Sequence, residues 1–257
     1  MKIMVCGKGG TGKTALTVLI AKILSKYFKV YIIDSDESNI VLPILLGVAA
    51  PKSLVEYIGG KKEEEEFEKM ETDIAKALTK AKEGIKLNLL PSNYISFSNE
   101  GIGLVIIGKV REYGEGCACP FNILTKILLS NLALDKNEVV LVDTDAGVEH
   151  VGRKIEEVSD CIIAIVDPTI ESLEIALLLK KIASNLNKKF WIIANKITNE
   201  IRDILIKEAE NMGLKIDGIV RFDKKMYLSY LKREPLKAGV ALIDLEKILK
   251  NLNLIIS

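Results

Sequence analysis

Short apolar runs alternate with longer stretches of helical periodicity along the chain. The runs are rich in valine and isoleucine and stand at 2–6, 30–34, 85–91, 104–108, 138–143, 161–167, 190–195 and 216–220. Between them, apolar residues recur at helical spacing over 14–27, 121–133, 170–186 and 199–212. Strands that are apolar throughout must be covered by helices on both faces of their sheet. The pattern predicts an α/β fold: a doubly wound, mostly parallel sheet of about seven to eight strands, in a single domain over 1–257.

Two further segments are set apart by their charge and spacing. The run KKEEEEFEKMETD at 61–73 is strongly charged, and we expect it to be a solvated surface segment. The stretch 240–257 has amphipathic spacing, and its polar face carries both signs of charge, at Asp244, Glu246, Lys247 and Lys250. A membrane-surface helix would carry a basic face. We therefore expect 240–257 to form a last helix docked on the domain.

The glycine-rich stretch GKGGTGKT, at 7–14, follows a predicted strand and opens a predicted helix. This is the phosphate-binding loop pattern in the context that it requires. Backbone amides can turn inward around phosphates, and the helix N-terminus adds partial positive charge. We expect Lys13 to reach the β- and γ-phosphates and the Thr14 hydroxyl to face magnesium. The remaining nucleotide contacts are expected from Gly9, Gly10, Thr11, Gly12 and Ala15.

A second lysine, Lys8, follows the first glycine of this loop. With it, the loop resembles those of the deviant phosphate-loop ATPases related to nitrogenase iron protein and the Min and Par positioning proteins. The resemblance implies a homodimer in which Lys8 reaches across a two-fold interface to the partner's phosphates, so that both lysines act at once. Lys8 and Lys13 are then both catalytic. A solvated loop lysine is the alternative for Lys8.

The stretch IIDSDESN, at 32–39, ends the second predicted strand with two aspartates. The resemblance implies that Asp36 belongs to a switch that orients the attacking water, and that Asp34 lies nearer the magnesium shell. Phosphoryl transfer asks the protein mainly for positioning and charge neutralisation. Asp36 is therefore a catalytic candidate and a magnesium-side candidate.

A second acidic stretch, LVDTDAG at 141–147, also ends a predicted strand. Asp143 is expected as the second magnesium-side carboxylate, beside Thr14 and Asp36. Gly147 is expected to let the backbone approach the γ-phosphate. A lone aspartate at a strand end is often only a helix cap, but here three elements of one nucleotide site follow in the expected order.

The stretch IIANKIT, at 192–198, is the candidate for binding the base of the nucleotide. Asn195 and Lys196 lie at the end of a predicted strand. A guanine-specific protein of this class would have an aspartate at position 198, whose carboxylate accepts from the ring. Thr198 stands there instead, so we expect ATP to be preferred over GTP, with Asn195 bonding the adenine edge. The alternative for Asn195 is a cap of the following helix.

Four cysteines are present, and two of them, Cys117 and Cys119, lie one residue apart. Two thiolates can bind a soft metal ion, but they supply only half of a tetrahedral ligand set. Packing as small apolar groups is the alternative for this pair. Cys6 and Cys161 lie in apolar strand-like runs, and we expect both in the core.

The stretches 114–132 and 143–153, with Cys117, Cys119 and a Glu149-His150 pair, resemble the carbon monoxide dehydrogenase maturation ATPase family. Members carry a Cys-x-Cys pair and an Ala-Gly-x-Glu-His switch on this ATPase fold. The resemblance covers nearly the whole chain, including VDPTIESLEIA and REPL, although Asp145 stands where glutamate is expected. It implies an ATP-dependent metallochaperone that delivers nickel, or a similar soft divalent metal, to a client such as carbon monoxide dehydrogenase.

A dimer would complete the ligand set of the close cysteines. If two protomers meet near residue 117, four thiolates close a tetrahedral site for nickel or zinc. His150 could couple the nucleotide state to this interface, or lie on the surface. Two other functions stay open: an iron-sulfur redox ATPase that uses the same thiolates, and a Min- or Par-like positioning ATPase.

The near-zero net charge disfavours some classes of binding partner. Lysine and arginine number 36 against 35 acidic residues, a net charge of +1, so there is no global field for nucleic acid or an anionic membrane. No apolar run approaches the ~18 residues of a membrane span, and the first residues form a strand-like run instead of a signal peptide. We expect a cytoplasmic protein with no nucleic-acid or membrane partner.

Overall fold

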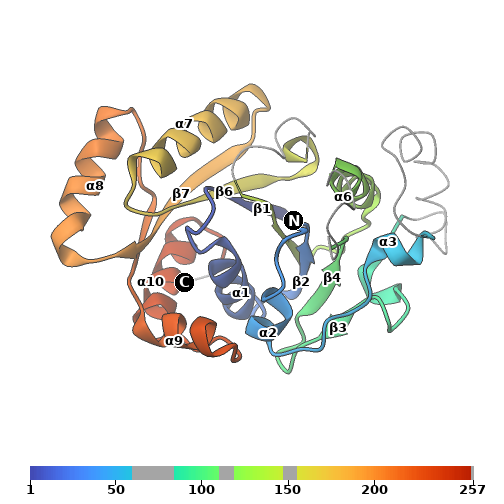
Figure 1. Cartoon of the computed structure of the whole chain (residues 1–257). Coiled ribbons are helices and arrows are strands. Elements are labelled where there is room, and N and C mark those ends of the chain that lie inside the picture. Colours follow the sequence, from blue (N-terminus) through green and yellow to red (C-terminus); the bar gives the residue numbers. More distant parts are fainter. Residues whose placement is uncertain (60–83, 110–118, 147–154, 256–257) are drawn as a thin grey trace.

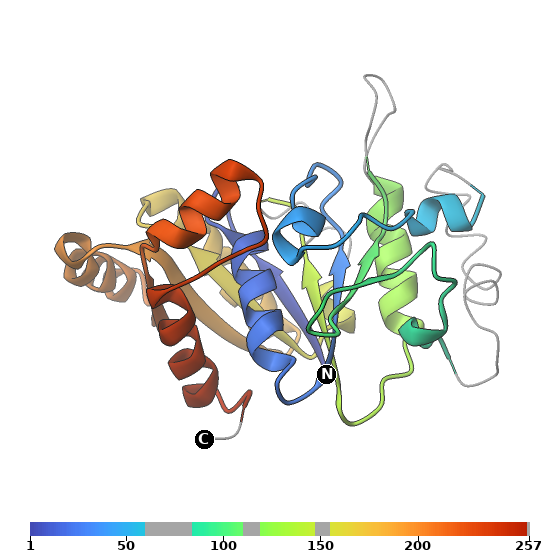
Figure 2. The same cartoon turned by 90° about the horizontal axis from the view of Figure 1, so that it is seen from below.

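The structure is a computed structural model that describes residues 1–59, 84–109, 119–146 and 155–255 (Figures 1 and 2). Several sequence predictions fall outside these residues and stay predictions. They concern the charged segment 61–73, Cys117, the Cys119 side chain, Gly147, Glu149 and His150.

One eight-stranded sheet runs through the molecule in the order β3-β4-β2-β5-β1-β6-β7-β8. Only β3 and β4 pair antiparallel among these strands; every other neighbouring pair is parallel. The predicted mostly parallel sheet is confirmed. The strands are β1 (Lys2–Cys6), β2 (Lys29–Asp34), β3 (Ser96–Phe97), β4 (Gly103–Ile106), β5 (Glu138–Asp143), β6 (Cys161–Val166), β7 (Lys189–Ile197) and β8 (Gly218–Arg221).

Helices cover both faces of the sheet (Figure 1). One face carries α1 (Lys13–Leu24), α2 (Leu42–Leu46), α9 (Lys224–Lys232) and α10 (Val240–Asn251). The other face carries α3 (Leu54–Tyr57), α6 (Cys119–Asn131), α7 (Ile170–Asn185) and α8 (Asn199–Asn211), with short 3-10 turns at Leu87–Leu89 and Glu156–Val158. Each inner strand contributes side chains to the cores on both faces of the sheet. In β1, Ile3 and Val5 are buried in one core, and Met4 and Cys6 are buried in the other. This two-sided burial explains why the strands are apolar throughout.

The predicted strand at 85–91 is wrong. Ile85 makes an isolated bridge to Leu132, and the chain then turns through the 3-10 helix at Leu87–Leu89. The apolar side chains of Ile85 and Leu87 are buried in the core beside α6. Burial alone therefore satisfies this run, without a place in the sheet. The eighth strand is instead β3, whose two residues pair with the edge of β4.

Other sequence predictions are confirmed in the core and at the C-terminus. Cys6 and Cys161 are both buried free thiols. The last helix, α10, packs through Ala241, Leu245, Ile248 and Leu249 against the face that also carries α1. None of the helices in the described ranges is long and apolar enough to cross a membrane.

The topology brings several strand ends together. In the sheet, β1 lies between β5 and β6, and β2 is on the far side of β5. The carboxyl ends of β1, β2 and β5 therefore meet at one edge, where parallel α/β folds usually bind ligands. The glycine-rich loop leaves β1 at this edge, and the two acidic stretches leave β2 and β5 beside it.

Candidate nucleotide-binding site

The loop between β1 and α1 depends on glycine at position 12. Gly12 caps α1 in the left-handed region, with φ 95°, a conformation that L-residues with side chains rarely adopt. A Cβ atom there would lie 2.5 Å from Asn195 Nδ2. Helix α1 begins at the next residue, Lys13, so its first free amides face the loop. The loop is shaped as an anion-binding helix N-terminus requires.

Contacts from β7 and from within the loop hold this conformation. Asn195 Nδ2 donates to the carbonyl of Thr11 at 2.8 Å, and Lys196 Nζ donates to the carbonyl of Gly10. Lys13 Nζ donates to the carbonyl of Lys8 at 3.3 Å. Because the Asn195 amide nitrogen is used in this way, a contact of Asn195 with adenine stays a prediction. In this structure the Asn195 side chain stabilises the loop conformation through its hydrogen bond to Thr11.

The predicted magnesium-side residues Thr14 and Asp143 are in contact. Thr14 Oγ1 donates to Asp143 Oδ2 at 2.7 Å, and Thr17 Oγ1 donates to Asp143 Oδ1 at 3.1 Å. Asn39 Nδ2 donates to both Thr14 Oγ1 and Asp143 Oδ2. Burial raises the pKa of Asp143 to about 6, although the Thr14 hydrogen bond and the Lys13 charge oppose it. Hydroxyl and carboxylate oxygens are the donors that magnesium prefers.

Asp34 is engaged by a lysine that the sequence analysis did not single out. Lys109 Nζ donates to Asp34 Oδ2 at 2.7 Å and to the carbonyl of Asp36 at 2.5 Å. Burial raises the pKa of Asp34, and the Lys109 ammonium opposes that rise. The contact pairs the fully buried Asp34 with a Lys109 side chain that is 12% exposed. The expected position of Asp34 nearer the magnesium shell stays a prediction.

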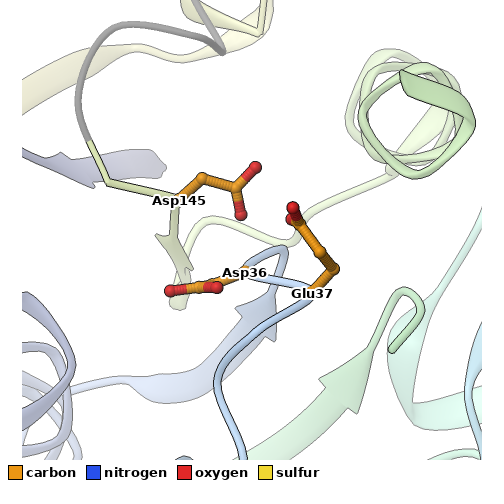
Figure 3. A group of neighbouring side chains, drawn as sticks. All are labelled: Asp36, Glu37 and Asp145. Atoms are coloured by element: carbon orange, nitrogen blue, oxygen red, sulfur yellow. The ribbon is translucent and has the colours of Figure 1, made fainter. Parts of the chain in front are cut away.

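Three carboxylates from two strand ends gather beside these residues (Figure 3). Asp36 and Glu37 follow β2 and Asp145 follows β5, and one oxygen from each lies within 4.8 Å of the others. Burial, and then the neighbouring Glu37 carboxyl, raise the pKa of Asp145. Asp36 also accepts from the backbone and hydroxyl of Ser38, which fixes its carboxylate. The predicted switch residue Asp36 therefore lies beside two further carboxyl groups, those of Glu37 and Asp145.

The Lys8 ammonium contacts residues at the start of α7. Its Nζ donates to Glu171 Oε2 at 2.5 Å and to Thr169 Oγ1 at 3.4 Å, at the start of α7. The Glu171 hydrogen bond raises the pKa of Lys8. Lys8 thus joins the phosphate loop to α7 within the chain. Its predicted action across a dimer interface requires that it leave Glu171.

A cavity of about 520 Å³ joins these groups. One end is lined by the loop and the residues after β2, among them Gly9, Gly10, Gly12, Lys13, Thr14, Ala15, Asp36 and Asn39. Asn195 and Lys196, which contact the loop, also line the cavity. The remaining lining includes Arg221, Phe222, Asp223, Met226, Tyr227 and Tyr230. Burial, and then the charges of Asp143 and Asp36, raise the pKa of Tyr230. The cavity has the size of a small-ligand site.

Several of these residues were not predicted from the sequence. Thr17 lies one turn after the loop motif, and Asn39 ends the acidic stretch, so both lay next to recognised signals. Lys109 and the residues of α9 had no motif to mark them, because their role depends on contacts across the fold.

No protein-family model matches the chain. An uncharacterized ATP-binding protein of Methanocaldococcus jannaschii is 40% identical over 94% of this chain and 96% of its own. The carbon monoxide dehydrogenase accessory protein CooC of Rhodospirillum rubrum is 30% identical over 87% of this chain and 81% of its own. The solved septum site-determining protein MinD of Pyrococcus horikoshii, complexed with Mg-ADP, is 17% identical with a TM-score of 0.69, over 98% of this chain and 95% of that one.

A phosphate loop on a doubly wound parallel sheet defines the class of phosphate-loop NTPases, and the likeness to MinD shows the same fold. The chain belongs to the family of phosphate-loop ATPases that contains the Methanocaldococcus jannaschii ATP-binding proteins and CooC.

Proposed function

We propose that the protein hydrolyses ATP in a nucleotide-switched homodimer, and couples this to binding and delivering nickel or a similar soft divalent metal. The client is a metalloenzyme such as carbon monoxide dehydrogenase, and the cytoplasm is the expected location. The likeness to CooC over most of both chains supports this reading. So do the Cys-x-Cys pair at 117–119 and the lysine-bearing phosphate loop.

The residues of the site fit magnesium-ATP. Amides of the loop and the Lys13 ammonium would hold the phosphates, and Thr14, Asp143 and Asp36 would hold magnesium. The ion would neutralise charge that develops on the transferred phosphoryl group. Asp36, which lines the cavity, would orient the attacking water. Lys8 of each subunit would add a positive charge at its partner's phosphates.

The observation that carries the metallochaperone proposal is a link between the cysteine segment and the nucleotide site. Helix α6 begins at Cys119, and its first two turns contact the end of β2. Ser35 Oγ lies 2.9 Å from Thr125 Oγ1 and donates to Asn122 Oδ1 at 3.4 Å. Ser35 directly precedes Asp36, which lines the cavity. A change at Asp36 on nucleotide binding could therefore shift the start of α6.

Anaerobic titration of nickel and zinc into the apo, ADP-bound and ATP-bound protein tests the proposal. We expect one tight metal per dimer, with an affinity that differs between nucleotide states. Cys117→Ser and Cys119→Ser should each remove tight binding, while the core variant Cys161→Ala should retain it. Equal affinity in all three states, or tight binding that survives the double serine change, would overturn the metal-delivery function.

The same preparation separates the two other functions. A brown protein with broad visible absorption and bound iron would support the iron-sulfur redox ATPase in place of the metallochaperone. ATP-dependent binding to lipid or DNA, without cysteine-dependent metal binding, would support a positioning ATPase.

A further inference from the structure

The end of the cavity away from the phosphate loop must receive the base and the ribose. When phosphates lie on the loop, the rest of the nucleotide extends into the remaining part of the cavity. Outside the phosphate loop and the residues after β2, the cavity lining includes residues at the end of β8 and on α9: Arg221, Phe222, Asp223, Met226 and Tyr227. None of them belongs to the motifs found in the sequence.

Two aromatic side chains in this part of the cavity lining are about half exposed to solvent. Phe222 and Tyr227 have ring centroids 6.0 Å apart at an interplanar angle of 46°. Phe222 is 47% exposed and Tyr227 is 56% exposed, although both rings line the cavity. Large aromatic surfaces left in water mark binding sites when they border a cavity. A flat heterocyclic base offers such rings a π-surface to stack on.

The polar groups at this end are largely occupied. The Asp223 carboxylate accepts from the backbone amides of Lys225, Met226, Gly239 and Ala241. The Arg221 guanidinium donates to both oxygens of Asp244, at 2.9 and 2.7 Å. Among the described residues that line the cavity, Asp36 and Asp223 are the acidic ones, and Asp36 is at the phosphate end. A guanine would therefore find no free carboxylate for its ring N–H and amino groups.

We propose that Phe222 and Tyr227 bind the adenine base by stacking, and that this wall, more than a hydrogen-bonding motif, supplies the affinity for the base. The saturated Asp223 then disfavours guanine, because a stacked guanine keeps unpaired donors. The inference concerns nucleotide binding, and it stands whether or not the protein delivers a metal.

Two ligands separate the base wall from the phosphate loop: magnesium-ATP, and magnesium-tripolyphosphate, which has no base. Calorimetry should show that Phe222→Ala and Tyr227→Ala each weaken ATP binding about 5- to 150-fold, as expected for one lost stacking contact. Tripolyphosphate affinity should stay within about 2-fold of wild type, since the loop is intact. Both rings are half exposed, so their loss should leave the thermal unfolding temperature nearly unchanged.

Matched variants on the same helix sharpen the test. Tyr227→Phe keeps the ring and should keep ATP affinity. Leu231 is 66% exposed on α9 and does not line the cavity, so Leu231→Ala should affect neither ligand. The proposal is overturned if ATP affinity is unchanged in both alanine variants, or if tripolyphosphate is lost equally. It is also overturned if Tyr227→Phe is as weak as Tyr227→Ala.

Discussion

Lys13 and Lys8 share one loop but meet different partners. Lys13 is nearly buried, and its ammonium is turned inward to the carbonyl of Lys8. The Lys8 ammonium instead donates a hydrogen bond to Glu171 on α7. The two lysines should therefore fail in different ways when they are removed.

Lys13→Ala should abolish nucleotide binding or turnover, because Lys13 supplies the positive charge at the β- and γ-phosphates. Lys8→Ala should leave binding largely intact, and should slow hydrolysis and weaken nucleotide-dependent dimers. Calorimetry, steady-state phosphate release and sedimentation measure the three effects. A full hydrolysis rate in Lys8→Ala would remove the proposed action of Lys8 across the interface.

Asn195 holds the phosphate loop through its hydrogen bond to the carbonyl of Thr11, and this contact predicts the effect of replacing Asn195. Asn195→Ala should weaken magnesium-ATP and magnesium-tripolyphosphate by the same factor, because the conformation of the loop is lost and not a contact to the base. The loss of one buried hydrogen bond is about 1 kcal/mol, or roughly 5-fold in affinity. A loss confined to ATP would show instead that Asn195 reads the adenine edge.

Between elements, Asp223 ties the starts of two helices together. It caps α9 through the amides of Lys225 and Met226, and it accepts from Gly239 and Ala241 at the start of α10. Burial alone would raise the pKa of Asp223, but these four amides outweigh it and hold that pKa below its ordinary value. One carboxylate thus positions α9, which carries the aromatic wall of the cavity.

The lowered pKa of Asp223 predicts how folding stability depends on pH. The folded state favours the ionised carboxylate, so its contribution is complete above the unfolded pKa of about 3.9 and is lost as the pH falls through the folded value. At neutral pH, Asp223→Asn keeps an oxygen that can cap α9 but loses the charge and the acceptor of the Gly239 and Ala241 amides. It should lower the free energy of unfolding by about 1 kcal/mol. The deficit measured by urea unfolding should shrink below about pH 4. Asp203→Asn, on the exposed face of α8, is the control; a deficit that does not change with pH would contradict the prediction.

The ion pair between Lys8 and Glu171 joins two elements and should oppose the proposed dimer. Glu171→Gln removes the charge that holds Lys8 in its own subunit, so ATP-dependent dimers should tighten. Solvent screens an exposed ion pair, so the gain should be small and should not exceed roughly 5-fold. The gain should vanish when Lys8 is also alanine, and Glu174→Gln on the same helix should show none. Sedimentation with ATP measures it, and an unchanged dimer affinity would mean that the pair does not restrain Lys8.

Across the whole molecule, α6 links the region of the close cysteines to the nucleotide site through Ser35. If metal and ATP favour the same or opposite dimer geometries, each must change the other's affinity by the same factor. Asn122→Ala and Thr125→Val should reduce this coupling, which is typically ~1 to 3 kcal/mol, while sparing the affinity for each ligand alone. Asn131→Ala, at the far end of α6, is the control. Metal titrations with and without ATP measure the coupling, and full coupling in both contact variants would rule out this route.

Local sequence determined the parts of the site that lie within a few residues of one another. The phosphate-binding pattern from Gly7 to Thr14 lies in consecutive residues, so its spacing was enough to predict the loop, although Asn195 and Lys196 of β7 also hold its conformation. The two-sided burial of the strands likewise left a continuous apolar pattern that predicted the layers. The run at 85–91 has the same apolar pattern, and the strand predicted from it is wrong. An apolar segment that packs against a sheet has the same composition as a strand that belongs to the sheet.

Tertiary structure alone decided which distant groups meet. Asn195 braces Thr11 across 184 positions, and Thr14 meets Asp143 across 129. Lys109 reaches Asp34, and the α9 aromatics reach the cavity, without any motif that sets them apart. Such contacts depend on strand order and helix placement, which follow from the packing of the whole chain. A pattern that is read a few residues at a time carries no information on that packing.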